Sequence, residues 1–166
     1  MIDTEQRTKP CSIFSHTAKM LKADVIFRWR DVMSDLQDHI NSAKRTGNID
    51  FSIEERSVDC VISRMPVTSG VLNPYGTVQA GAMIWLADVT ASVLALEGQT
   101  IGEDGKGFPL AIDIHTNLVS NQKDGEILAE ARFVSKGKTV LVIRTRMIGN
   151  KDKLLAEVTT THVIAK

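Results

Sequence analysis

Cysteine is scarce in this sequence. Only Cys11 and Cys60 occur among 166 residues, and neither stands at a spacing typical of metal ligands. This scarcity favours neither a disulfide framework nor a zinc site, and a reducing compartment is then the default. The first ten residues are polar and carry acidic side chains, with no apolar core of a signal peptide behind them. We therefore expect a cytoplasmic protein that holds no metal.

The sequence also lacks an excess of charge and a run of apolar residues long enough to cross a bilayer. Lys and Arg number 20, Asp and Glu number 20, and the formal net charge is zero, which gives no reason to expect nucleic acid as a partner. The most apolar segment starts at Ala80 and runs for about 16 residues, roughly 24 Å of helix, whereas a bilayer crossing needs ~20 residues. We expect no membrane insertion.

What the chain does contain is enough apolar material, 43% of its residues, for one globular domain with an appendage. In residues 24–44, apolar side chains recur every three or four positions with charges between them, which predicts an amphipathic helix. We divide the chain into an N-terminal extension, residues 1–50, and a main domain, residues 51–166. The helix of the extension either packs on the outside of the domain or serves as an arm that binds a partner.

The segment from Asn73 to Leu96 is the centre of the predicted main domain. Its Asn-Pro-Tyr-Gly start has the chemistry of a turn, and the apolar residues from Ala80 onward leave almost no polar face. Such a helix is enclosed by protein, and an ionised carboxylate within it costs free energy unless donors or a partner charge compensate it. Asp88 is that carboxylate, which makes it the leading candidate for a catalytic residue. The alternative is a structural carboxylate bonded to Thr90, Ser92 or a backbone amide.

Strand patterns surround this helix. Residues 51–71 have a β-like alternation, and further strands are expected at about 109–120, 126–135, 139–148 and 154–164, with clear turn residues between the last three. An apolar helix needs cover on several sides, which one curved sheet provides. The sequence therefore predicts an α+β fold in which a curved antiparallel sheet wraps around one long central helix.

Three segments form a recognisable combination. They are Asn73…Gly76-Thr77-Val78-Gln79-Ala80-Gly81…Leu86-Ala87-Asp88, Ile112-Asp113-Ile114, and Lys136-Gly137-Lys138-Thr139. Together they resemble the hot-dog-fold acyl-CoA thioesterases of the 4-hydroxybenzoyl-CoA thioesterase superfamily, in particular the phenylacetate-degradation type, over about residues 50–166. The resemblance implies a homodimer whose sheets join edge to edge, or a homotetramer, with active sites at the subunit interface. It also implies an acyl-CoA substrate and no cofactor beyond the CoA that the substrate carries.

The resemblance also implies roles for the residues of the site. Asp88 would act as general base or as nucleophile, with Asn73 and Gln79 completing the catalytic set. Backbone N–H groups at Ala80 and Gly81 would stabilise the oxyanion, since a helix start favours negative charge.

Three other side chains are candidates for substrate binding. Trp85 either fills the core or lines the acyl pocket. Lys136 and Lys138 either meet the phosphates of CoA or form an ordinary solvated hairpin.

The chain departs from the family pattern at three positions. Gln79 and Ala80 stand where the family has His and Gly, and Ala111 stands where a Ser or Thr often faces the Asp. These changes keep open a second hypothesis, a non-catalytic acyl-CoA binding or sensing protein, beside the leading one, a thioesterase for a medium-chain or aromatic acyl-CoA. A third, a dehydratase or hydratase, is disfavoured because the central helix contains no His. His115 and His162 have no triad partner at a recognisable spacing, and a structural role is predicted for both.

Overall fold

A computed structural model describes residues 49–97, 99, 101 and 105–165 of the chain. The predicted helix of residues 24–44 lies outside the described residues, as does nearly all of the extension that we placed at residues 1–50. Both remain predictions.

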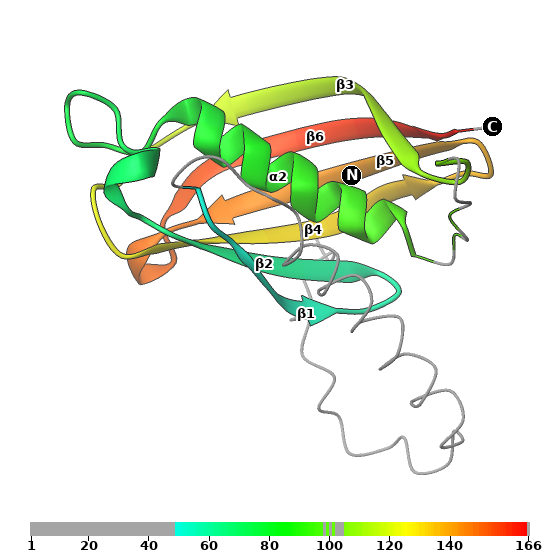
Figure 1. The fold of residues 1–166 in the computed structure, drawn as a ribbon, viewed down its shortest axis with the longest axis horizontal. Helices are drawn as coiled ribbons and strands as arrows, with labels where there is room; N and C mark the ends of the chain where they lie inside the picture. The colour runs from blue at the N-terminus through cyan, green and yellow to red at the C-terminus, as the bar shows by residue number, and fades with distance from the viewer. Residues whose placement is uncertain (1–48, 98, 100, 102–104, 166) are drawn as a thin grey trace, which may run out of the picture. The chain divides into compact units, whose positions relative to one another are not determined.

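Six strands of this domain form one antiparallel sheet in the order β1-β2-β4-β5-β6-β3 (Figure 1). The strands are β1 Ser52–Arg56, β2 Cys60–Pro66, β3 Pro109–Leu118, β4 Glu126–Lys136, β5 Val140–Ile148 and β6 Leu154–Ile164. The predicted segment 51–71 thus contains two strands, and the bounds of β6 agree with the prediction. The α+β class and the curved antiparallel sheet are confirmed.

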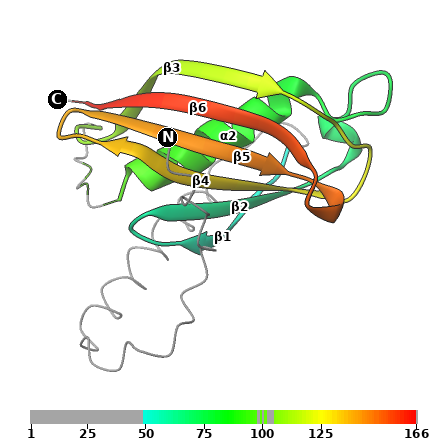
Figure 2. The same cartoon turned by 180° about the vertical axis from the view of Figure 1, so that it is seen from behind.

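The central helix, α2, spans Ala80–Ala95 and lies on one face of this sheet. It contacts β2, β3, β4, β5 and β6, and the view from behind shows these strands in front of it (Figure 2). Alternation places the strands' apolar side chains against it: Ile127, Ala129 and Ala131 of β4 are fully buried, as are Leu86 and Ala87 of the helix. The apolar composition predicted this helix, and its start and length are confirmed.

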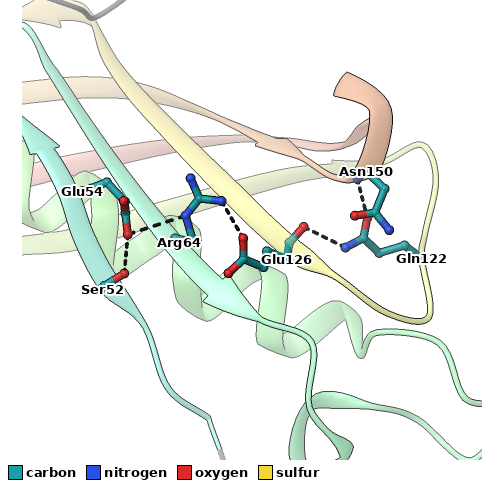
Figure 3. Close-up of polar contacts among 6 residues, drawn as sticks. All are labelled: Ser52, Glu54, Arg64, Gln122, Glu126 and Asn150. Carbon is teal, nitrogen blue, oxygen red and sulfur yellow. Dashed lines mark hydrogen bonds and ion pairs between the residues drawn. The ribbon is translucent and has the colours of Figure 1, made fainter.

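The start of α2 is held in place by the segment that joins β3 to β4. The Val78 N–H donates to the Gln122 carbonyl oxygen at 3.0 Å, and Asn121 Nδ2 donates to the Val78 oxygen at 2.9 Å. The Gln122 side chain donates to the Glu126 carbonyl at 2.9 Å and accepts from the Asn150 N–H at 2.8 Å (Figure 3). These bonds fix the first turn of the helix relative to one end of the sheet.

An ion pair holds the other end of the helix. Arg56, the last residue of β1, lies 3.5 Å (Nε to Oε2) from Glu97, just after α2, and the two side chains are only 6% and 4% exposed. By contrast, Arg64 with Glu54 and Glu126 forms a surface network at the edge of β2 (Figure 3). Exposed pairs of this kind contribute little to stability.

Candidate active site

One side of α2 is only partly covered by the sheet of its own protomer. Gly81 is exposed, and the half-buried residues of the helix that share its side are Ile84, Trp85, Asp88, Val89 and Ser92. Their spacing of three or four residues places them on one side of the helix. Asp88 stands in the middle of this stripe, while the opposite side of the helix is buried against the sheet.

The Asp88 carboxylate contains an oxygen without a hydrogen-bond partner. Its Oδ1 is buried and accepts no hydrogen bond from any described residue. Thr90, the suspected structural partner, donates its hydroxyl to the Leu86 carbonyl at 2.6 Å instead. A buried carboxylate oxygen left without a donor costs free energy. A bond to Thr90 therefore does not account for this oxygen.

His162, for which the sequence predicts a structural role, is the second ionisable side chain of this region. It lies on β6, is fully buried, and its Nε2 lies 2.9 Å from Thr160 Oγ1, whereas Nδ1 has no partner among the described residues. Burial lowers the pKa of the ring below its ordinary value, and the negative charge of Asp88 acts in the opposite direction. The two residues therefore form an electrostatic pair between helix and sheet.

The strand register explains why His162 faces the helix. Along β6 the alternating side chains of Ala156, Val158, Thr160 and His162 are buried, and the first two pack in the core with α2. His162 is paired across the sheet with Leu141 of β5 and with Ala111 of β3. Paired residues share a face of the sheet, so Ala111 is the immediate neighbour of His162. The alternation of Val158, Thr160 and His162 was the signal in the sequence that indicated this face.

The Asn73 side chain is engaged in its own turn. Its Nδ2 donates to Thr77 Oγ1 at 2.7 Å, and its Oδ1 accepts from the backbone N–H groups of Tyr75 and Thr77 at 2.9 and 3.2 Å. Gly76 closes the turn at a φ of 72°, where residues with a Cβ are strained. Within the protomer Asn73 therefore shapes the loop before α2, and its catalytic role stays a prediction.

The first turn of α2 presents free donors. Gln79 precedes the helix and makes no capping bond with its side chain, which is exposed. The backbone N–H groups of Ala80 and Gly81 are among the first four of the helix, which have no acceptor within it. A Cβ built on Gly81 meets no atom within 4 Å. The start of the helix is therefore open to a ligand.

The candidate substrate-binding residues lie apart from one another. Trp85 packs edge-on against Phe51, with ring centroids 5.2 Å apart, and borders the core. Lys136 Nζ lies 4.6 Å from the centre of the Phe133 ring, and Lys138 is exposed in the β4–β5 turn. This turn is at the opposite end of the sheet from the start of α2 (Figure 1). The structure does not bring the lysines to the helix start of the same protomer.

No three His, Cys, Asp or Glu side chains of the described residues are grouped as metal ligands. In the same part of the chain no helix combines the length and the hydropathy of a membrane span.

Comparisons with known proteins show that the chain is similar to an esterase and to several thioesterases. No protein-family model matches it. Over 116 residues it is 24% identical to the "Putative esterase ComA2" of Bacillus subtilis, covering 70% of this chain and 90% of that protein. A mutant thioesterase from Staphylococcus aureus has a similar structure, with a TM-score of 0.65 and 27% identity over 70% of this chain and 93% of its own.

Two further solved structures share the fold. A hypothetical thioesterase from Streptococcus pneumoniae, solved with coenzyme A, has a TM-score of 0.62 and 18% identity, and the match covers 69% of this chain and 88% of that one. A phenylacetic acid degradation-related putative thioesterase from Ralstonia eutropha has a TM-score of 0.62 and 20% identity, over 69% and 84%. The resemblance to hot-dog thioesterases, including the phenylacetate-degradation type, is confirmed. So is the predicted class of enzyme, a thioester hydrolase.

Proposed function

We propose that the protein hydrolyses an acyl-CoA with a medium-chain or aromatic acyl group to the free acid and CoA. The observation that carries this proposal is the Asp88 carboxylate, which sits in the middle of an apolar helix with a buried oxygen that no described residue satisfies. Such an oxygen is placed to accept a proton from a bound water. The thioesterase relatives and the coenzyme A bound to one structural neighbour support the choice of substrate.

In the proposed reaction Asp88 acts as the general base. It takes a proton from a water whose oxygen attacks the thioester carbonyl carbon, and the negative charge moves to the carbonyl oxygen. The N–H groups of Ala80 and Gly81 stabilise that oxyanion at the helix start. When the carbon–oxygen double bond reforms, the carbon–sulfur bond breaks, and the CoA thiolate leaves and takes up the proton held by Asp88. In a variant of this route, Asp88 itself attacks the carbonyl carbon as the nucleophile and forms a transient anhydride.

One protomer does not hold all these groups at one place. Asp88 lies eight residues after Ala80, which is roughly 12 Å along the helix axis at 1.5 Å per residue. A base and an oxyanion donor that serve the same carbonyl must each lie about 3 Å from their targets. We therefore infer that Asp88 of one protomer works with the helix start of another, as the predicted interfacial site requires.

The edge strand β3 supports a homodimer of this kind. Its large apolar side chains are partly exposed: Leu110 by 49%, Ile112 by 61%, Ile114 by 44% and Leu118 by 49%. An exposed apolar edge invites pairing with another strand. Two-fold antiparallel pairing of β3 with its copy would set the helix start of each protomer beside the β4–β5 turn of the other. Lys136 and Lys138 would then be close enough to meet the phosphates of CoA.

Substitution of Asp88 by Asn tests the catalytic proposal. The amide keeps the shape of the side chain but accepts no proton, so hydrolysis should fall by roughly 10²- to 10⁴-fold. The measurement is release of free thiol from a panel of medium-chain and aromatic acyl-CoA thioesters. Asp59→Asn, the same change in the exposed β1–β2 turn, is the matched control and should keep the parent rate.

Hydrolysis by Asp88→Asn at the parent rate would show that Asp88 is not the catalyst. If no thioester of the panel releases thiol although CoA esters raise the melting temperature, the protein is the non-catalytic binding protein instead. Cytoplasmic location, a tetrameric assembly and the absence of a cofactor stay predictions.

A further inference from the structure

Two of the buried polar atoms without a hydrogen-bond partner in the described part of the chain belong to residues that act on each other. They are Asp88 Oδ1 on α2 and His162 Nδ1 on β6, and the charge of Asp88 acts on the His162 ring. Buried polar atoms of native proteins usually have partners, so each unpartnered atom requires an explanation, and a bound water is one. Neither the resemblance to thioesterases nor the proposed mechanism assigns a role to His162.

We propose that His162 is a positioning residue of the active site, whose Nδ1 holds the water that Asp88 activates. One polar molecule between the helix and β6 would supply both unpartnered atoms with a hydrogen bond. This inference rests on the proposed thioesterase function, because it assigns a further residue to the same site.

The position of Ala111 gives the reason for a histidine here. Ala111 is the cross-strand partner of His162 and shares its face of the sheet. Its methyl group supplies no hydrogen bond to a water near Asp88. The pairing register between β3 and β6 shifts between Ala111 and Asp113. The regular alternation of β3 side chains between the two faces of the sheet is therefore interrupted directly after Ala111. The ring of His162 brings a polar atom to this row of the sheet from the neighbouring strand.

The surroundings of the ring suit a neutral histidine. Leu141 and Ala111, its neighbours on β5 and β3, carry no charge, and Asp88 is the sole ionisable residue of α2. Lys136, the β4 residue paired with Leu141, has its ammonium group over the Phe133 ring. Thr160 Oγ1 lies beside Nε2, and each neutral tautomer leaves Nδ1 available, as a donor in one and an acceptor in the other.

The first test compares His162→Leu with His162→Asn in steady-state hydrolysis. Leucine removes the polar atom, so kcat should fall roughly 100-fold, the cost of a misplaced reactant, while KM stays within a few-fold of the parent. Asparagine places an amide close to the position of Nδ1 and should retain more of kcat. Ala111→Ser added to His162→Leu supplies a hydroxyl from the neighbouring strand and should recover part of the loss.

Ser63→Ala is the matched control for removal of a buried polar group. Ser63 Oγ is also buried without a partner, but it lies on β2, which β4 and β5 separate from β6. Three strand spacings amount to roughly 14 Å, so this variant should keep the parent kcat. If the leucine variant keeps the parent kcat, or if asparagine and Ala111→Ser restore nothing, His162 is structural and the proposal is wrong.

A second test does not depend on hydrolysis. NMR titration of the His162 ring, assigned by its loss in His162→Asn, gives its pKa in the parent protein and in Asp88→Asn. Removal of the carboxylate charge should lower that pKa, and an unchanged value would overturn the proposal. A lowered value without any thioester hydrolysis would retain the pairing of the two residues but refute the thioesterase function on which the catalytic role depends.

Discussion

At the scale of the residue, the molecule is distinguished by an acid on the central helix and a buried imidazole on the sheet whose pKa the charge of that acid raises, against the effect of burial. Asp88 is the sole ionisable residue of α2, and His162 is a fully buried ring of β6. Asp88 was predictable because a carboxylate inside an apolar helix is conspicuous in a sequence. His162 was not, because a strand pattern without its neighbours does not say which face meets the helix.

The buried ring of His162 predicts a dependence of stability on pH. Burial lowers the pKa of the folded-state ring below its ordinary value of 6.5, with the charge of Asp88 opposing that shift. The unfolded chain then binds the proton more readily, so the contribution of His162 is fully present above pH 6.5 and is lost as pH falls below it. Urea unfolding between pH 7.5 and 5.5 should show stability decreasing in this window.

Two variants check the origin of this loss. Asp88→Asn removes the charge that opposes the shift, so the loss between pH 6.5 and 5.5 should be at least as large as in the parent protein. In His162→Asn the contribution of the ring is absent, and the slope of stability against pH should be smaller. A slope unaltered in His162→Asn would mean that another group titrates.

At the scale of the element, α2 combines two tasks with different requirements. Its buried side packs on five strands, while Gly81 in its first turn is exposed and the stripe around Asp88 is only half-buried. Gly81 shows the compromise, since glycine weakens a helix but leaves room for a ligand to approach the backbone.

Gly81→Ala should therefore separate stability from activity. An added Cβ meets no atom within 4 Å, so the helix should gain up to about 1 kcal/mol from the lower backbone entropy of alanine in the unfolded chain. The same methyl group intrudes where the thioester carbonyl would bind, and KM should rise. Thermal melting and steady-state kinetics measure the two effects. An unchanged KM would place the oxyanion site elsewhere.

The elements that the sequence predicted clearly differ from the others in the strength of their local sequence signals. The helix, the β4–β5 hairpin and β6 were predictable because their periodicity and turn residues are local signals. The division of residues 51–71 into β1 and β2 was less clear, because Ser57, Val58 and Asp59 form a short turn without Gly or Pro.

At the scale of the whole molecule, the described protomer does not join the groups that the proposed reaction needs. The helix start and Asp88 are too far apart to serve one carbonyl, and β3 leaves an apolar edge exposed. The proposed second copy, paired along β3, would explain both features.

Ile112→Lys should weaken this assembly. A lysine on an edge strand opposes pairing with another strand because its charge must be desolvated. Sedimentation should shift toward the monomer, and thioester hydrolysis should be lost together with the dimer. Val58→Lys introduces the same charge at a side chain that is 53% exposed in the β1–β2 turn, and it should change neither. A monomer that keeps the parent kcat would show that one protomer holds a complete site.

The sequence by itself determined the local elements, the antiparallel sheet around one helix and the unusual acid within that helix, because periodicity, turn residues and a buried charge are properties of short segments. Tertiary structure alone decided that His162 and Ala111 are cross-strand partners on one face of the sheet, and that the β4–β5 turn lies far from the helix start of its own protomer. These relations depend on strand register and on the order of strands in the sheet, which join residues distant in the chain.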